Sequence, residues 1–245
     1  MKKIKLPKII GHRGACGLAP ENTMSSLIKA SLLKLSFVEI DVKISKDSIP
    51  ILLHDDDLSR TTNGNGLCCK YDFDKLSMLD AGKWYSKEFE NERILSLSKC
   101  LDFLFEKKIS VNIELKPNKG KEFENVKSIG DLLKSKKNLP NFFFTTFDLY
   151  SLDLVSAILP LVPIGFLIED SSFYGKENVI DICKQYDCFS VGLKSSMVNK
   201  ETVDFFKKHN LTITTFTVNS VDQAYDFFSL GVDSIFSDRP DLLNI

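Results

Sequence analysis

The sequence has almost no excess of charge of either sign. Its 245 residues include 32 Lys and Arg against 33 Asp and Glu, so the formal net charge is −1 at pH 7. Proteins that bind nucleic acid normally carry a basic face that attracts phosphate groups. The balanced composition therefore argues against a nucleic-acid partner.

Long hydrophobic runs are also missing. A membrane-spanning helix needs about 18 or more apolar residues in a row, and a signal peptide needs about 7–15. The basic residues at the start of the chain lead only to Ile9 and Ile10 before Gly11 interrupts the apolar run. We therefore expect no membrane span and no secretory signal.

The cysteines lack any Cys-x-x-Cys pair. Without an export signal, an even number of cysteines is no evidence of a disulfide framework. We predict a cytoplasmic protein with reduced thiols. The six cysteines stand at positions 16, 68, 69, 100, 183 and 188.

What is present is an alternation of short apolar, β-branched runs with longer amphipathic segments. This pattern is typical of βαβ units and a parallel sheet, that is, of the α/β class. Asn22 and Ser220 stand where two of the helices would need N-caps. The runs expected to form strands are 8–11, 37–42, 49–54, 110–116, 142–147, 163–168, 189–194, 211–218 and 234–237. The segments expected to form helices are 23–35, 97–107, 121–137, 149–159, 176–186, 200–209 and 221–230.

Nine strands are one more than a closed eight-stranded barrel uses. The runs 37–44 and 49–54 are separated only by residues 45–48, which is too short for the crossover that two parallel strands need. These runs are therefore expected to form a hairpin, with one of them as an extra strand. The other eight predict a single (β/α)8 TIM-barrel domain over residues 1–245.

Residues 55–96, between the second and third barrel strands, break the alternation. They are polar and rich in turn residues at first, and aromatic later. Segments this long within a compact domain are usually functional. We interpret residues 55–96 as an insertion that acts as a lid over the barrel mouth, with a plain surface excursion as the alternative.

Strand periodicity places acidic side chains on one face. Glu39 and Asp41 lie two residues apart in one strand, as Glu114 and Lys116 do in another. Side chains alternate between the faces of a strand, and the outer face of a barrel strand packs on helices, so these four are expected to point inwards. Converging carboxylates repel one another unless cations neutralise them. Together, the three acids favour a divalent metal site, and an ion-pair cluster with Lys116 and Arg13 is the alternative.

Only three histidines occur. His12 and His54 each end a predicted strand, so both are expected at the same barrel mouth as the acids, whereas His209 lies near the end of a predicted helix. No metal-ligand spacing such as His-x-x-x-His is present, so we assign His12 and His54 to proton transfer. Arg13 and Lys116 suit a phosphate oxyanion, which favours phosphodiester chemistry. The sequence does not say which histidine is acid and which is base.

Short motifs occur in order along nearly the whole chain. They are Gly11-His12-Arg13-Gly14, Ala19-Pro20-Glu21-Asn22-Thr23, Glu39-Ile40-Asp41-Val42, Lys46-Asp47, Pro50, His54-Asp55, Arg60-Thr61-Thr62-Asn63-Gly64, Glu114-Leu115-Lys116-Pro117, Thr217-Val218-Asn219, Gly231-Val232-Asp233 and Ser237-Asp238-Arg239-Pro240. In these motifs the sequence resembles the glycerophosphodiester phosphodiesterase family.

The resemblance implies a barrel fold and hydrolysis of deacylated phospholipids, such as glycerophosphocholine or glycerophosphoethanolamine, to sn-glycerol 3-phosphate and an alcohol. It implies one divalent cation, Ca²⁺ or Mg²⁺, with Mn²⁺ as a further choice. The implied site residues are His12 and His54 for acid–base catalysis, Glu39, Asp41 and Glu114 for the metal, and Arg13 and Lys116 for the phosphate.

One position departs from the family pattern. A tryptophan usually precedes Thr-Val-Asn, whereas here Phe216 stands there. We therefore place Phe216 in the substrate pocket and expect it to alter the shape of the part that receives the alcohol.

Two other functions stay open. A phospholipase D-type enzyme acting on lysophospholipids or sphingolipids would need exposed apolar residues to meet a lipid surface. Phe73, Trp84, Tyr85 and Phe89 are the candidates, although packing favours a small core of the insertion itself. A non-catalytic phosphate-binding barrel is disfavoured because both histidines and all three acids are present.

Overall fold

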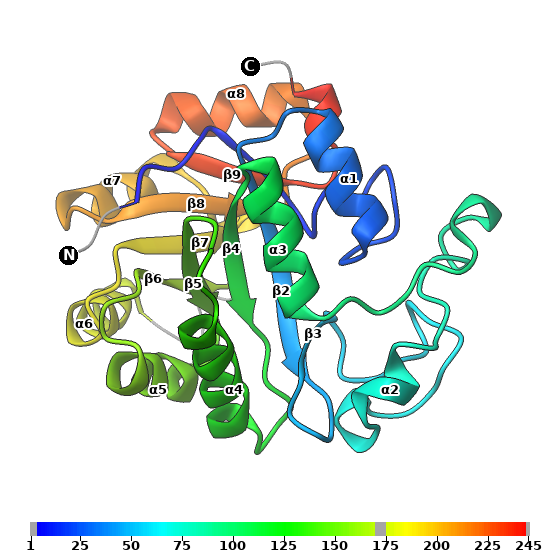
Figure 1. Ribbon diagram of the computed structural model, residues 1–245. Helices are drawn as coiled ribbons and strands as arrows, with labels where there is room; N and C mark the ends of the chain where they lie inside the picture. Colours follow the sequence, from blue (N-terminus) through cyan, green and yellow to red (C-terminus); the bar gives the residue numbers. More distant parts are fainter. Residues whose placement is uncertain (1–3, 170–174, 244–245) are drawn as a thin grey trace.

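The computed structural model describes residues 4–169 and 175–243, and in this part of the chain eight parallel strands close into a barrel (Figure 1). Closure is made by β1, which pairs in parallel with both β2 and β9. The barrel strands are β1 (Ile9–Gly11), β2 (Phe37–Ile44), β4 (Ser110–Leu115), β5 (Phe142–Thr146), β6 (Ile164–Ile168), β7 (Ser190–Lys194), β8 (Thr212–Phe216) and β9 (Ser234–Ser237). The predicted (β/α)8 barrel is confirmed.

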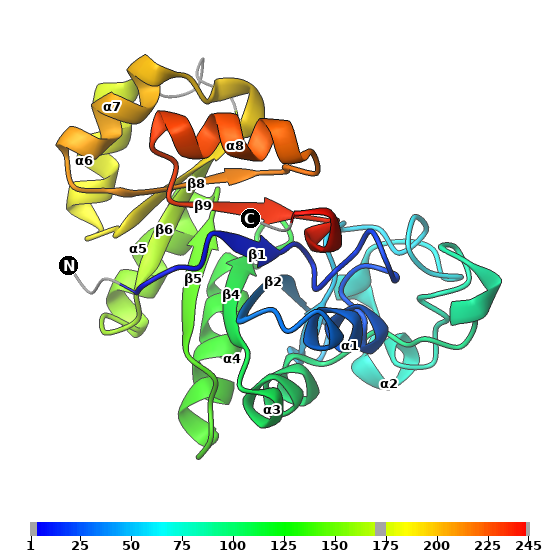
Figure 2. The same ribbon diagram turned by 90° about the horizontal axis from the view of Figure 1, so that it is seen from above.

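Helices follow the strands and cover the outside of the barrel (Figures 1 and 2). They pack on the outward side chains of the strands, so that Val38, Ile40 and Val42 of β2 are fully buried in the layer between sheet and helices. None of the helices in the described ranges has both the length and the apolar composition to cross a membrane. The helices are α1 (Met24–Leu32), α3 (Leu97–Lys107), α4 (Glu122–Ser135), α5 (Leu149–Ile158), α6 (Lys176–Gln185), α7 (Lys200–Lys208) and α8 (Val221–Leu230).

The extra strand is β3 (Pro50–Leu52), which pairs antiparallel with the end of β2. This is the predicted hairpin. The chain then forms η1 (Cys68–Lys70), α2 (Phe73–Leu76) and η2 (Lys87–Phe89), which lie to one side of the barrel in both ribbon views. Two further short helices are η3 (Ser195–Met197) and η4 (Pro240–Leu242).

Residues 55–96 share a small apolar core with β3 and the residue that follows it. Phe73 packs against this core, which consists of Ile51, Leu53, Leu58, Cys68, Leu76, Ala81 and Ile94. The other predicted aromatics contact one another instead: the Tyr85 ring lies 5.7 Å from that of Trp84 and 5.6 Å from that of Phe89, between ring centroids. Trp84 remains 40 % exposed.

The N-cap of α1 differs from the prediction. Thr23, not Asn22, is the N-cap, and its side chain accepts a hydrogen bond from the Ser26 N–H. Asn22 turns inward, where its Nδ2 donates to Asp41 Oδ2 at 2.9 Å and its Oδ1 accepts from the Asp41 N–H at 3.1 Å. Both residues are cap formers by type, so the sequence alone could not separate their roles. Ser220 is the N-cap of α8 as predicted.

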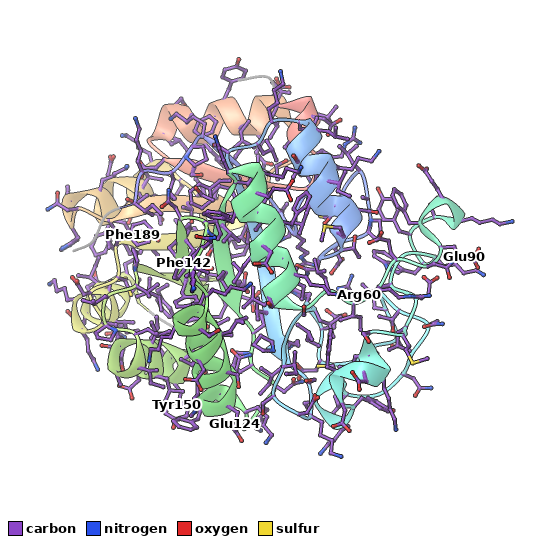
Figure 3. All side chains as sticks on the ribbon, viewed as in Figure 1. Arg60, Glu90, Glu124, Phe142, Tyr150 and Phe189 are labelled. Atoms are coloured by element: carbon purple, nitrogen blue, oxygen red, sulfur yellow. The ribbon has the colours of Figure 1, made fainter. Side chains whose placement is uncertain are left out.

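The barrel interior is divided into an apolar half and a polar half. The apolar half is a buried cluster in which the Phe143 ring lies 5.8 Å from that of Phe37 and 5.3 Å from that of Phe189, between centroids. Phe189 is fully buried, whereas Tyr150, labelled at the edge of the molecule in Figure 3, is exposed. Further along β2, towards its carboxyl end, the inward residues become Glu39 and Asp41. The phenyl cluster thus closes one end and leaves polar groups at the other.

Candidate active site

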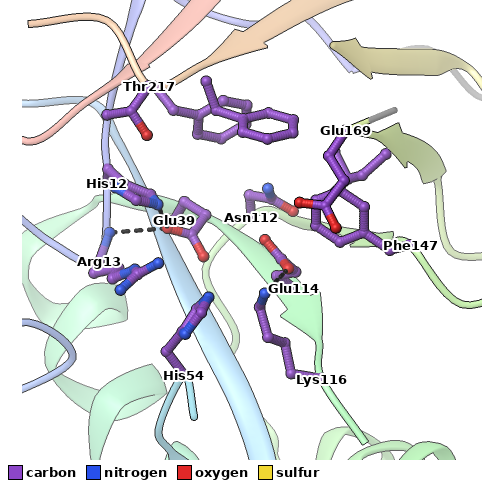
Figure 4. Close-up of a pocket in the computed structure, with 13 residues that line it drawn as sticks. His12, Arg13, Glu39, His54, Asn112, Glu114, Lys116, Phe147, Glu169 and Thr217 are labelled. Atoms are coloured by element: carbon purple, nitrogen blue, oxygen red, sulfur yellow. Dashed lines mark hydrogen bonds and ion pairs between the residues drawn. The ribbon is translucent and has the colours of Figure 1, made fainter. Parts of the chain in front are cut away.

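A cavity of about 420 Å³ lies at the carboxyl ends of the barrel strands (Figure 4). Its lining brings together seven of the eight predicted site residues. The eighth, Asp41, lies directly behind them with no exposed surface. The lining residues are His12, Arg13, Glu39, His54, Asn112, Glu114, Lys116, Phe147, Leu167, Glu169, Phe216, Thr217 and Phe236.

The three predicted metal ligands form one buried cluster. Glu39 and Asp41 come from β2, Glu114 from β4, and Asp41 is the register partner of Glu114. One carboxylate oxygen of each lies within 4.8 Å of the others. Oxygens that bind Ca²⁺ on opposite sides are about 5 Å apart, because each lies about 2.3–2.6 Å from the ion. The spacing therefore fits a hard divalent cation.

Buried carboxylate oxygens in this cluster lack hydrogen-bond donors. Within the described residues, Glu39 Oε1, Asp41 Oδ1 and Glu114 Oε1 have no hydrogen-bond partner. The last two have ion-pair contacts with Lys116 Nζ, at 3.8 Å from Asp41 Oδ1 and 2.9 Å from Glu114 Oε1. A buried polar atom without a partner destabilises a fold by about 1–3 kcal/mol, and by more when it is charged. An ion bound between the three carboxylates would remove this penalty. The donor set thus fits the cation that the sequence implied.

Electrostatics distinguishes the three acids. Burial, with Asp41 and Glu114 nearby, raises the pKa of Glu39 well above its usual value, and burial likewise raises the pKa of Glu114. Burial also acts to raise the pKa of Asp41, but Arg13 and Lys116 outweigh it and lower this pKa to about 2. The two basic side chains therefore hold Asp41 as an anion, whereas burial and the neighbouring carboxylates disfavour the ionised forms of Glu39 and Glu114.

Arg13 and Lys116 line the cavity beside the acids. The Arg13 N–H donates to Glu39 Oε2 at 2.9 Å, and its guanidinium contacts Glu21 at 2.7 Å and Asp41 at 3.2 Å. Although burial acts to lower the pKa of each, the adjacent carboxylates raise the pKa of both Arg13 and Lys116. Two permanent cations thus border the cavity.

His12 is fixed by a carboxylate at the far end of the chain. Its Nδ1 lies 2.6 Å from Asp238 Oδ1, and its Nε2 lies 3.8 Å from Glu39 Oε2. Asp238 is held in turn by Asn219 Nδ2 at 2.8 Å and Cys16 Sγ at 2.9 Å. Burial acts to raise the pKa of Asp238, but the hydrogen bonds that this carboxylate makes with His12, Cys16 and Asn219 outweigh burial and lower the pKa. Asp238 therefore stays ionised. The pair turns His12 Nε2 towards the acid cluster.

His54 has a carboxylate partner next to it in the chain. Its Nδ1 lies 2.6 Å from Asp55 Oδ1, and Asp55 is bound through both oxygens by Arg60. Burial lowers the pKa of His54, and Arg13 and Lys116 add to this effect although Asp41 opposes it. His54 is therefore a neutral imidazole near pH 7.

Several contacts of the site were not predicted. The motifs that contain Glu21, Asp55, Arg60 and Asp238 were recognised in the sequence, but no role was assigned to these residues. A carboxylate next to a strand-end histidine, as in His54-Asp55, is a signal that could have been used. For Asp238, 226 positions from His12, no local signal exists.

Other proteins share this arrangement of sequence and fold. The model of the glycerophosphoryl diester phosphodiesterase family matches residues 12–242. The chain is 31 % identical to YhdW of Bacillus subtilis over 235 residues, which are 96 % of each protein. It is 28 % identical over 239 residues to a glycerophosphodiester phosphodiesterase of Caldanaerobacter subterraneus subsp. tengcongensis, covering 96 % of this chain and 95 % of that protein.

The structural comparison agrees with these matches. A phosphodiesterase of Oleispira antarctica, solved in complex with the product sn-glycerol-3-phosphate, superimposes with a TM-score of 0.91 at 33 % identity. The match covers 97 % of this chain and 95 % of that one. The family match spans nearly the whole chain and contains both histidines and all three acids. The chain therefore belongs to the glycerophosphoryl diester phosphodiesterase family and is an enzyme, a phosphoric diester hydrolase.

Proposed function

We propose that this enzyme hydrolyses water-soluble glycerophosphodiesters, deacylated phospholipids such as glycerophosphocholine and glycerophosphoethanolamine, to sn-glycerol 3-phosphate and an alcohol. The observation that carries the proposal is one cavity in which two carboxylate-backed imidazoles, His12 and His54, adjoin a buried acid cluster. A phosphodiester needs a proton acceptor for the nucleophile and a proton donor for the leaving alcohol, and two imidazoles supply both near neutral pH.

The cation implied by the family has a fitting site. Glu39, Asp41 and Glu114 would hold one Ca²⁺ or Mg²⁺, and Mn²⁺ fits the same oxygen donors. When bound, it would polarise a phosphoryl oxygen and stabilise negative charge in the transition state. Arg13 and Lys116 would bind the phosphate oxygens from the cavity border, Arg13 with a planar donor group and Lys116 as a point charge.

The glycerol part of the substrate offers a nucleophile. We propose that one imidazole removes the proton of the 2-hydroxyl, whose oxygen attacks phosphorus and forms a cyclic phosphate while the other imidazole protonates the leaving alcohol. Water then opens the ring with the proton transfers reversed. Intramolecular attack gains a large effective molarity over attack by water. Cleavage of a 2-deoxy analogue as fast as the natural diester would exclude this route.

The test is a metal-dependent assay on a panel of glycerophosphodiesters. We expect His12→Ala to lose turnover while binding metal normally, and Glu39→Ala to bind metal more weakly. His209→Ala is the matched control, because His209 lies at the end of α7, away from the cavity, beside the Phe205 ring. Wild-type rates in both site variants would show that these roles are assigned wrongly.

A second candidate is a phospholipase D-type enzyme that acts on lysophospholipids. It is favoured by exposed apolar residues within 55–96, namely Leu67, Met78 and Trp84, which are 43 %, 76 % and 40 % exposed. A lipid surface would give such residues a partner. Faster cleavage of lysophospholipid micelles than of glycerophosphocholine would favour this candidate over the first.

The lid role of residues 55–96 and the cytoplasmic location also stay proposals. Arg60 supports the first, because it joins this segment to Glu21 at 2.8 Å and, within the segment, binds Asp55 beside His54. Among the described residues that line the cavity, none comes from 55–96. A lid would therefore have to move inward on binding, and glycerol 3-phosphate should then protect this segment from limited proteolysis.

A further inference from the structure

We infer that one wall of the cavity selects substrates by the charge of their alcohol. This wall, the selectivity wall, consists of Glu169, Phe147 and Phe216, and it favours an alcohol that carries an ammonium group over a neutral or anionic one. The inference rests on the proposed function, because it names which glycerophosphodiesters the same site prefers.

Glu169 is a carboxylate without an assigned task. It follows β6 directly, lines the cavity and is exposed. Within residues 4–169 and 175–243 it has no hydrogen-bond or ion-pair partner, whereas Glu39 accepts from the Arg13 N–H and Glu114 pairs with Lys116. It is also outside the acid cluster that fits a metal. Its charge is therefore available to a ligand.

The two rings give Glu169 an apolar, electron-rich surrounding. Phe147 follows β5 and Phe216 ends β8, and their ring centroids lie 5.6 Å apart with an interplanar angle of 88°. Figure 4 shows Phe147 beside Glu169 on the same side of the cavity. Aromatic faces attract cations, and Lys116 Nζ already lies 5.2 Å from the Phe147 centroid. Phenyl rings offer no hydrogen bonds to the hydroxyl groups of a neutral polyol.

Charge is arranged unevenly across the cavity. Figure 4 places Arg13 and His54 on one side of the acid cluster and Glu169 with Phe147 on another. A phosphate held by Arg13 and Lys116 would leave one substituent able to reach the selectivity wall. An ammonium group there would meet a carboxylate and aromatic rings, which together bind quaternary or primary ammonium ions. An anionic substituent would meet repulsion from Glu169.

The test compares alcohols that differ in charge. We expect the wild-type enzyme to show kcat/KM about tenfold higher for glycerophosphocholine and glycerophosphoethanolamine than for neutral glycerophosphoglycerol, with glycerophosphoserine slower than the ammonium diesters. Glu169→Gln should abolish the preference by lowering kcat/KM only for the ammonium diesters, and Glu169→Lys should reverse it. Because exposed charges are screened by salt, the wild-type preference should shrink at high ionic strength.

The control is Glu177→Gln, an equal charge change at an exposed position in the first turn of α6, outside the cavity lining. It should leave all rates unchanged. Equal rates of the wild-type enzyme on all diesters would overturn the selectivity wall. An equal loss on all of them in Glu169→Gln would also overturn it, because Glu169 would then bind the glycerol common to every substrate.

A binding measurement separates this inference from the proposed function. Calorimetry on the turnover-deficient His12→Ala variant should show tighter binding of glycerophosphocholine than of glycerophosphoglycerol, and the additional Glu169→Gln change should remove the difference. If the wild-type enzyme cleaved none of the diesters but the charge-selective binding were present, the proposed reaction would be refuted and the selectivity wall would be supported. Cleavage of the diesters without charge-selective binding would support the proposed reaction and refute the selectivity wall.

Discussion

At the scale of single residues, the two imidazoles of the site differ in what lies behind them. Asp55, behind His54, is bound through both oxygens by the cationic Arg60. Asp238, behind His12, has uncharged donors besides the histidine among the residues that the structure describes, namely Asn219 and Cys16. More of the negative charge of Asp238 is therefore left to act on its histidine, so we expect His12 to depend more strongly on its carboxylate.

Asp238→Asn tests this dependence. The amide keeps the size of the side chain but removes the charge, so His12 loses the acceptor that fixes its tautomer and ring orientation. We expect kcat to fall by about 10²- to 10⁴-fold, the usual contribution of acid–base catalysis, with little change in metal affinity. Asp226→Asn, at an exposed position of α8, is the matched control. A change in KM or in metal affinity alone, with kcat preserved, would contradict the positioning role.

Asp55→Asn should move one limb of the pH–rate profile. The hydrogen bond with Asp55 acts to raise the pKa of His54, against the dominant lowering by burial, so its removal lowers this pKa further. The limb that reports His54 therefore shifts to lower pH. If the acid limb moves, His54 is the base, and if the alkaline limb moves, His54 is the acid. An unchanged profile would show that His54 does not limit the rate in either role.

At the scale of helices and strands, the sequence predicted the architecture because each signal was local. Alternating apolar and polar positions in β2 settled which side chains face inwards, and the short link 45–48 predicted the β2–β3 hairpin. The partners of the site residues depend instead on barrel closure, which brings β1 beside β9 and so His12 beside Asp238. The alternation of apolar and polar residues within one strand does not show which distant side chains barrel closure brings into contact.

The N-terminus of α1 offers a test of the N-cap that the sequence assigned to Asn22 and the structure assigns to Thr23. Thr23→Ala removes the N-cap and should lower the free energy of unfolding by about 1 kcal/mol without changing metal affinity. Asn22→Ala removes both hydrogen bonds that Asn22 makes to Asp41, so it should weaken metal binding as well as stability. Thermal denaturation and a metal titration of the two variants distinguish these outcomes. Weaker metal binding in Thr23→Ala alone would reverse the assignment.

At the scale of the whole molecule, the phenyl half of the barrel and the acid cluster act on stability in opposite directions. The apolar half gains stability from burial, whereas the cluster concentrates ionisable groups where water is excluded. The cluster stands on the strands β2 and β4, which pair over six residues, so its electrostatic energy contributes to the stability of the barrel itself. Folding and metal binding should therefore be linked.

The sign of this linkage follows from the pKa shifts. Asp41, with a pKa of about 2 against 3.8, stabilises the fold above pH 3.8, and this contribution is lost as the pH falls through 2. Glu39 and Glu114 have raised pKa values, because burial disfavours their ionised forms. Their contribution to the free energy of unfolding of the metal-free protein is fully present below 4.5, the ordinary pKa of a glutamate. It is lost as the pH rises from 4.5 through the raised pKa values. The metal-free protein should thus become less stable towards neutral pH.

A bound divalent cation should reverse that loss, because it binds the ionised carboxylates in competition with protons. At a concentration of 100 times its Kd, the ion adds about 2.7 kcal/mol. This raises the Tm of a chain of this size by about 5–10 °C. We expect a shift of this size with Ca²⁺ or Mg²⁺ at pH 7 and a smaller one at pH 5, measured by differential scanning calorimetry.

The Glu39→Gln, Glu114→Gln double variant should lose both the shift and the decline in stability towards pH 7, whereas Glu177→Gln should keep both. A shift of equal size in the double variant, or a larger one at pH 5, would place the ion elsewhere on the protein.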